Sequence, residues 1–131
     1  MCMTDKKIQR IYVAGPITPK GYHSVHPVID YLHNMKELIR WSLEVLKLGY
    51  DPFCPALDFM YFILLRDQEC ITEAMIKRYS KSWLSVCDAV MLTPGWRKST
   101  GTLAEIQLAE NLGIPVFKSF DELKEHGATN E

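Results

Sequence analysis

The stretch GWRKSTGTLAE, from Gly95 to Glu105, joins one glutamate to a run of small and hydroxyl-bearing residues. Apolar residues follow Glu105 at helical spacing, namely Leu108, Ala109 and Leu112, so the glutamate shares the apolar face of a predicted helix. The N-terminus of a helix also favours an ionised carboxylate. An anionic glutamate held in a pocket is suited to attack or stabilise an electron-poor carbon, typically the anomeric carbon of a sugar. We therefore predict that Glu105 is catalytic.

The residues before Glu105 have the composition of a phosphate-binding loop. Small side chains let backbone N–H groups approach a ligand, and serine and threonine hydroxyls can hydrogen-bond to it. We expect substrate to be bound here by Gly95, Ser99, Gly101 and Thr102.

A structural explanation of Glu105 stays open beside the catalytic one. Thr102-x-x-Glu105 matches a capping box, in which Glu105 bonds back to the backbone at Thr102. In a purely structural domain, Glu105→Gln would lower stability by about 1 kcal/mol and affect no ligand.

The elements that must position these residues alternate between strand and helix. Apolar runs bounded by Gly and Pro predict strands, and a stripe of apolar residues at a period of 3.6 predicts helices. The expected strands lie at 11–14, 50–55, 87–95 and 114–117, and the expected helices at 27–48, 70–86, 102–112 and 120–126. The segment 56–69 is ambiguous between a short helix and a lid. This alternation predicts an α/β fold with a parallel sheet of four to five strands between two helical layers, flavodoxin-like or Rossmann-like.

Ligands of such sheets bind beyond the carboxyl ends of the strands. Two loops leave the predicted strands with suitable residues, GPIT after the first strand and PGWRKSTGT after the third. The apolar strand that precedes the second loop opens with Asp88, for which we expect a structural role in binding backbone N–H groups.

The segments IYVAGPIT and CDAVMLTPGWRKSTGTLAEIQLAENLGIPVF resemble the nucleoside 2-deoxyribosyltransferase superfamily, which includes nucleotide N-glycosidases. The resemblance covers most of the chain and is strongest at these two segments. It implies that Glu105 attacks C1′ of the sugar and forms a glycosyl-enzyme intermediate, with Tyr12 orienting its carboxylate. It also implies that the turn formed by Gly15, Pro16 and Ile17 contacts the sugar or phosphate of the substrate.

Two positions depart from the transferases of that superfamily. Ser99 stands where they carry an aspartate, and the nucleotide hydrolases of the superfamily also have serine there, which favours nucleoside 5′-monophosphates because serine can donate to a phosphate. Ser80 stands where another substrate-contacting aspartate is expected, and a serine cannot act as a general acid near neutral pH. Asp58 is the candidate to replace it as a substrate-binding acid, although a structural role in capping or in a turn is the more usual one for such an aspartate.

The resemblance leaves several functions open. If water resolves the glycosyl-enzyme intermediate, the protein is a hydrolase. If an acceptor base resolves it, the protein is a transferase. A phosphoribohydrolase of the cytokinin-activating type also uses a Gly-Thr-x-x-Glu segment. The loop before that segment is a double-glycine run in those enzymes, and PGWRKSTGT matches it poorly. Ser80 favours a third option, a non-catalytic module that binds or senses a nucleotide.

The length and the net charge of the chain exclude other classes of protein. The 131 residues fit one domain, 1–131, and a net charge of −1 argues against binding a nucleic-acid polymer. We expect no membrane span and no signal peptide, hence a cytoplasmic protein with free thiols. His23 and His26 form an HxxH too small for a metal site, so we expect no metal and no cofactor. The resemblance implies a homo-oligomer.

Overall fold

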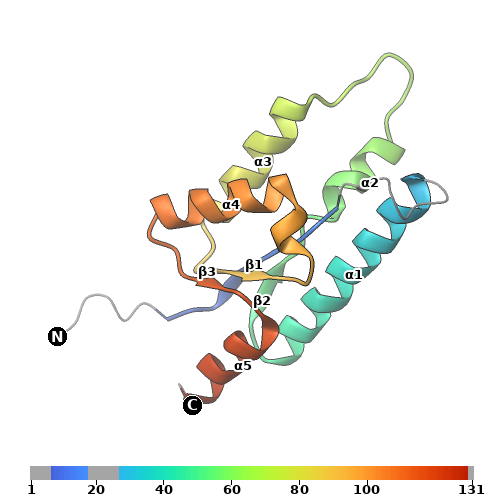
Figure 1. Ribbon diagram of the computed structural model, residues 1–131. Helices are drawn as coiled ribbons and strands as arrows, with labels where there is room; N and C mark the ends of the chain where they lie inside the picture. Colours follow the sequence, from blue (N-terminus) through green and yellow to red (C-terminus); the bar gives the residue numbers. More distant parts are fainter. Residues whose placement is uncertain (1–6, 18–26, 130–131) are drawn as a thin grey trace.

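Four parallel strands form the central sheet, in the order β2-β1-β3-β4. The structure is a computed structural model that describes residues 7–17 and 27–129, and it describes residues 57–59, 128 and 129 through their backbone only. The strands are β1 Arg10–Ala14, β2 Asp51–Phe53, β3 Ala89–Leu92 and β4 Val116–Phe117. The predicted α/β class, with a flavodoxin-like or Rossmann-like parallel sheet, is confirmed (Figure 1).

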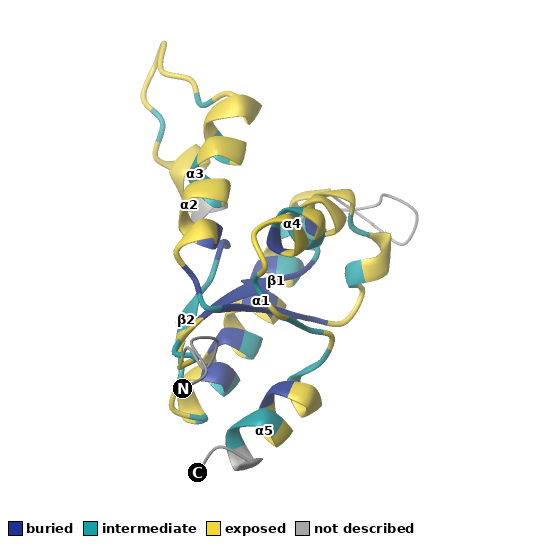
Figure 2. Ribbon diagram, turned by 90° about the vertical axis from the view of Figure 1, so that its left-hand side faces the viewer, coloured by how far each residue is buried: buried dark blue, intermediate teal, exposed yellow. Residues whose placement is uncertain are grey.

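Helices cover both faces of the sheet and make three layers. They are α1 Pro27–Lys47, α2 Leu57–Ile63, α3 Glu73–Ser85, α4 Thr100–Asn111 and α5 Phe120–Thr129, with a 3₁₀ turn η1 at Trp96–Lys98. Figure 2 shows α1 and α5 on one side of the buried strands and α3 and α4 on the other. The segment 56–69, for which the sequence predicts a short helix or a lid, thus contains the short helix α2.

The side chains of β1 divide between two cores because successive residues of a strand point to opposite faces. Ile11 and Val13 pack with the buried residues of α1 and α5. Tyr12 and Ala14 pack on the opposite face, with Leu84 of α3 and other buried residues of α4 and β3. Tyr12 is therefore directed toward the same side of the sheet as Glu105.

The strand order reverses between β1 and β3. The chain leaves β1 through α1 to reach β2 on one side, and later returns through α3 to β3 on the other side of β1. The loops that follow β1 and β3 diverge at such a point and leave room for a ligand between them. These are the two loops that carry GPIT and PGWRKSTGT. Among residues 7–17 and 27–129, no helix combines the length and apolarity that crossing a membrane requires.

Candidate functional site

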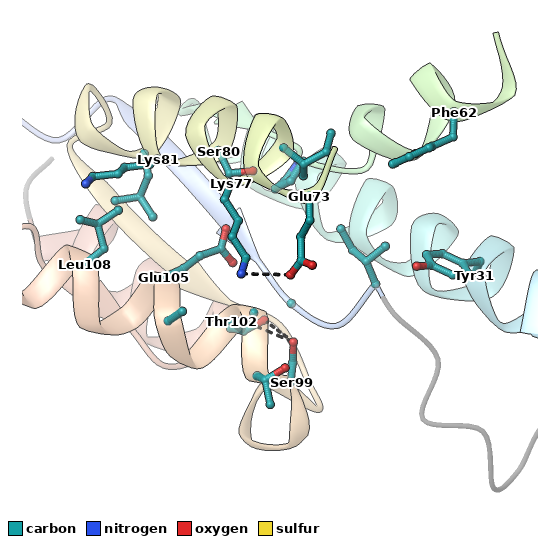
Figure 3. Close-up of a pocket in the computed structure, with 18 residues that line it drawn as sticks. Tyr31, Phe62, Glu73, Lys77, Ser80, Lys81, Ser99, Thr102, Glu105 and Leu108 are labelled. Atoms are coloured by element: carbon teal, nitrogen blue, oxygen red, sulfur yellow. Dashed lines mark hydrogen bonds and ion pairs between the residues drawn. The ribbon is translucent and has the colours of Figure 1, made fainter. Parts of the chain in front are cut away.

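A cavity of about 800 Å³ lies beyond the carboxyl ends of β1 and β3, with α3 and α4 as its two walls (Figure 3). Residues of the helices α1, α2, α3 and α4 and of the loops after β1 and β2 line it, although they are far apart in the sequence. Most residues that the sequence predicts for the site are among them, namely Gly15, Ile17, Ser80, Ser99, Gly101, Thr102 and Glu105. The switch point in strand order is therefore also where the chemistry-bearing side chains meet.

Glu105 projects from the second turn of α4 into this cavity and is only partly buried. The hydroxyl of Tyr12 donates a hydrogen bond to Oε2 of Glu105. Tyr12 is fully buried, and its ring stacks on Phe53 with the ring centroids 5.5 Å apart. Phe53 stacks in turn on Trp83 at 5.2 Å, so the phenol is held by packing as well as by its strand. The bond fixes the carboxylate against a rigid donor at the edge of the sheet.

The predicted capping box between Thr102 and Glu105 is wrong. Ser99 is the N-cap of α4, with an extended backbone at φ −103° and ψ 111°, and its side chain accepts a hydrogen bond from the Thr102 N–H. Thr102 therefore lies inside the helix, where it has no capping role. Because Ser99 already caps the helix, Glu105 bonds to Tyr12 rather than to the backbone at Thr102.

The Ser99 hydroxyl belongs to a residue that lines the cavity at the start of α4. Its oxygen accepts from the Thr102 N–H at 3.3 Å and from the Thr102 hydroxyl at 2.9 Å. A serine oxygen has two acceptor positions and one O–H donor, so these two bonds use its acceptor capacity and leave the O–H to point elsewhere. Thr102 is buried and holds this arrangement in place. An anion at the start of α4 would meet both a hydroxyl donor and the positive end of the helix dipole.

Gly15 lines the cavity at the end of β1. Its position leaves no room for a side chain. A Cβ at this position would lie 1.8 Å from Oγ1 of Thr93, the residue after β3, whose backbone N–H donates to Ala14 at 2.9 Å. The close approach of the two chains therefore requires glycine. Ile17 follows in the same loop, and its carbonyl accepts a hydrogen bond from Nδ2 of Asn34 on α1 at 3.0 Å.

Two residues predicted to bind substrate do not line this cavity. Gly95 has a φ of +88°, a left-handed conformation that favours glycine, and it serves as the N-cap of η1. Pro16 instead lines a separate cavity of about 230 Å³ on the α1 side. The side chain of Asp58 lies outside the described residues.

Sequence reasoning missed most of the α3 wall. Besides Ser80, this helix lines the cavity with a stripe at helical spacing, namely Glu73, Ile76, Lys77, Lys81 and Leu84. The apolar residues Met75, Trp83 and Val86 of this segment are exposed instead. Ser80 could have identified part of this stripe, because the positions four before, three before and four after it share its helix face.

Lys77 and Glu73 form an ion pair on this wall, with Nζ and Oε1 3.0 Å apart. Both side chains are largely exposed to solvent, at 74% and 81%. In Figure 3 the Lys77 ammonium reaches across from α3 toward the Glu105 carboxylate, whereas Lys81 extends away along its helix.

Asp88 has the structural role expected of it. Its Oδ2 accepts from the backbone N–H groups of Gln9 at 2.9 Å and Arg10 at 2.8 Å. It thereby aligns the start of β3 with the start of β1.

No cluster of three or more metal-ligating side chains occurs in the described part of the chain. His23 and His26 lie outside the described residues.

Comparison with known protein families places the chain in a family. The model of the family described as "Domain of unknown function (DUF4406)" matches residues 9–118, well over half of the chain. The matched region runs from the start of β1 to just beyond β4 and contains Tyr12, Ser80, Ser99 and Glu105. No curated protein sequence matches the chain.

Proposed function

We propose that this chain, which belongs to that family, cleaves or exchanges the N-glycosidic bond of a nucleoside or nucleoside 5′-monophosphate. One observation carries the proposal: the Glu105 carboxylate stands in a large cavity at the switch point of a parallel sheet, fixed by the buried Tyr12 hydroxyl. The resemblance to the nucleoside 2-deoxyribosyltransferase superfamily supports the same chemistry, because both residues stand at its motif positions.

Glu105 is the nucleophile of the proposed reaction. An oxygen of its carboxylate attacks C1′ as the bond from C1′ to the base breaks, and a glycosyl ester forms. Tyr12 holds the carboxylate in one orientation during the attack, which lowers the entropic part of the barrier. Water or a second base then attacks C1′ and frees Glu105. These steps need no metal or redox cofactor.

The preferred substrate in this proposal carries a 5′-phosphate. The Ser99 hydroxyl, the N-terminus of α4 and the small residue Gly101 line one end of the cavity together. They offer hydrogen-bond donors and a positive helix end without a negative side chain. A phosphoribohydrolase of the cytokinin-activating type would break the same bond, and the range of nucleotides cleaved would separate the two activities.

A second candidate function is a nucleotide-binding module without chemistry. Ser80 lines the α3 wall at the position where the resemblance leads us to expect an aspartate. Such a module would bind nucleotide with Glu105 intact and release no base. Calorimetric titration beside a base-release assay separates it from an enzyme.

We place this activity in the cytoplasm, on a small-molecule substrate rather than a nucleic-acid polymer. The described cysteines Cys54, Cys70 and Cys87 are free thiols, as is usual in a reducing compartment.

We further propose that the chain forms at least a dimer. Several apolar side chains of α1 and of the segment at the end of α2 are 50% exposed or more, including Leu32, Ile63 and Leu64. Where such side chains lie together, they are typical of an interface between subunits. Light scattering at micromolar concentration would give at least twice the chain mass, and the mass of a single chain would contradict a dimer.

The function is tested by base release. The protein is incubated with ribo- and deoxyribonucleosides and their 5′-monophosphates, with and without an acceptor base, and free base is measured by chromatography. Glu105→Gln is compared with Glu110→Gln, which changes an exposed glutamate of the same helix outside the cavity. We expect wild type and Glu110→Gln to release free base, and Glu105→Gln to release none. Nucleotide binding without release would favour the binding module.

A further inference from the structure

The proposed reaction needs a proton donor for the departing base. Breaking the bond from C1′ to the base leaves an electron pair on the base nitrogen, and most bases leave slowly without protonation. Glu105 must be ionised to attack, and the Tyr12 hydroxyl is bonded to it. Ser80 lines the cavity but cannot act as a general acid near neutral pH.

The α3 wall carries an ammonium group that lines the same cavity as Glu105. Lys77 lies one turn before Ser80 on the same face of the helix and lines the cavity with Glu105. Figure 3 shows its side chain directed toward the Glu105 side of the cavity, with the ammonium held by Glu73. Lysine is among the side chains that serve as general acids.

The pairing of Lys77 with Glu73 allows the ammonium to move to a substrate. The two charges are four residues apart on one helix and are both exposed, at 74% and 81%. Exposed pairs of this type contribute little to stability. A base in the cavity can therefore replace Glu73 as the partner of the ammonium at small cost.

We infer that Lys77 protonates the departing base, in place of the acid that Ser80 cannot provide. This inference rests on the proposed function. Oε of Glu105 forms a bond to C1′ while the bond from C1′ to the base nitrogen breaks. The electron pair goes to the base, which receives a proton from Nζ of Lys77 and leaves neutral. The lysine amine then takes a proton from the incoming water as its oxygen bonds to C1′ and Glu105 leaves as a carboxylate.

Three variants separate proton donation from charge and from packing. Lys77→Met removes the ammonium at similar length, and Lys77→Arg keeps the positive charge but cannot release its proton. Arg78→Met is the matched control, because Arg78 is the next residue of α3 and is exposed outside the cavity. Melting temperatures equal to that of Arg78→Met would show that the Lys77 variants fold.

Each variant is assayed on two substrates with the same sugar. One is the best natural substrate of the base-release panel, and the other is the 4-nitrophenyl glycoside of its sugar, whose nitrophenolate leaves without a proton. We expect Lys77→Met and Lys77→Arg to lower kcat on the natural substrate by about 100-fold, as general acids typically contribute. On the nitrophenyl glycoside their rates should stay close to that of wild type.

Different outcomes overturn different parts of the account. Equal losses on both substrates, full activity of Lys77→Arg, or no effect of Lys77→Met would each overturn the role of Lys77 and leave Glu105 chemistry standing. A wild-type protein that releases neither base nor nitrophenolate would overturn the proposed function itself, and the role of Lys77 with it.

Discussion

The hydroxyl of Tyr12 on β1 donates a hydrogen bond to Oε2 of Glu105 on α4, and this bond joins the centre of the sheet to the cavity. The two residues come together because Tyr12 points to the face of the sheet that α4 covers. The donor is fully buried and stacked on Phe53, while the acceptor is open to the cavity. A rigid donor and an accessible carboxylate form the relationship that a positioned nucleophile requires.

Tyr12→Phe tests this positioning. The phenylalanine ring keeps the stacking on Phe53, so the fold should persist with a loss of about 1 kcal/mol of unfolding free energy for the missing hydrogen bond. Without the hydrogen bond that orients Glu105, we expect the transition state to lose about 1.4 kcal/mol of stabilisation. Base release should then fall about tenfold. Urea unfolding and kcat/KM provide the two measurements. Unchanged kcat/KM would show that Glu105 does not depend on Tyr12.

Ser99→Asp tests the phosphate end of the cavity. Aspartate caps helices as well as serine does, so the stability of α4 should change little. Its negative charge would repel a 5′-phosphate at the start of α4, whereas a nucleoside would not be affected. We expect the ratio of kcat/KM for 5′-monophosphate over nucleoside to fall at least about tenfold, equivalent to roughly 1.4 kcal/mol. An unchanged ratio would mean that the phosphate binds elsewhere.

The two cavity glycines should respond differently to alanine. In Gly15→Ala the new methyl group meets Thr93 Oγ1 at 1.8 Å, and we expect a loss of about 1–3 kcal/mol of unfolding free energy from overpacking. In Gly101→Ala nothing lies within 4 Å of the new Cβ, and alanine favours the helix by up to about 1 kcal/mol. Because Gly101 lines the cavity, its methyl group should raise KM without destabilising the protein. Denaturant unfolding that finds equal losses for the two variants would contradict this difference.

The buried thiol of Cys87 predicts a pH dependence of stability. Burial, together with the nearby Asp88 carboxylate, raises the pKa of Cys87 to about 11 from an ordinary value of 9.0, and Arg10 acts in the opposite direction. The folded protein thus holds this proton more tightly than the unfolded chain. Its contribution to stability is full below pH 9.0 and is lost as pH rises through about 11.

Urea unfolding measured between about pH 8 and about pH 10.5 checks the Cys87 prediction. The unfolding free energy should fall with rising pH in wild type and fall less in Cys87→Ala. The same slope in both proteins would assign the dependence to other groups.

The alternation of strands and helices was predictable because apolar runs and glycine or proline boundaries are local features of the sequence. The inner face of a helix was harder to predict. On α1 the buried residues include Leu38 and Val45, whereas the equally apolar Leu32 and Ile39 are about half exposed. This helix carries apolar residues on more than one face, so periodicity alone does not determine which face meets the sheet.

The α3 wall was missed for a different reason. A helix face that lines a cavity is partly polar, as Lys77 and Ser80 show, and hydrophobic periodicity assigns such a face to solvent. The start of α4 was misplaced because Ser99 and Thr102 both match local capping patterns.

The most direct test of the central claim is to detect the sugar attached to Glu105. A 2′-fluoro analogue of the best substrate slows breakdown of the glycosyl ester, so the quenched protein can be digested and its peptides weighed by mass spectrometry. The account predicts a mass increase of one glycosyl group on the peptide at Glu105, with one equivalent of base released, and neither in Glu105→Gln. Base release without any adduct, or an adduct on another residue, would contradict Glu105 as the nucleophile.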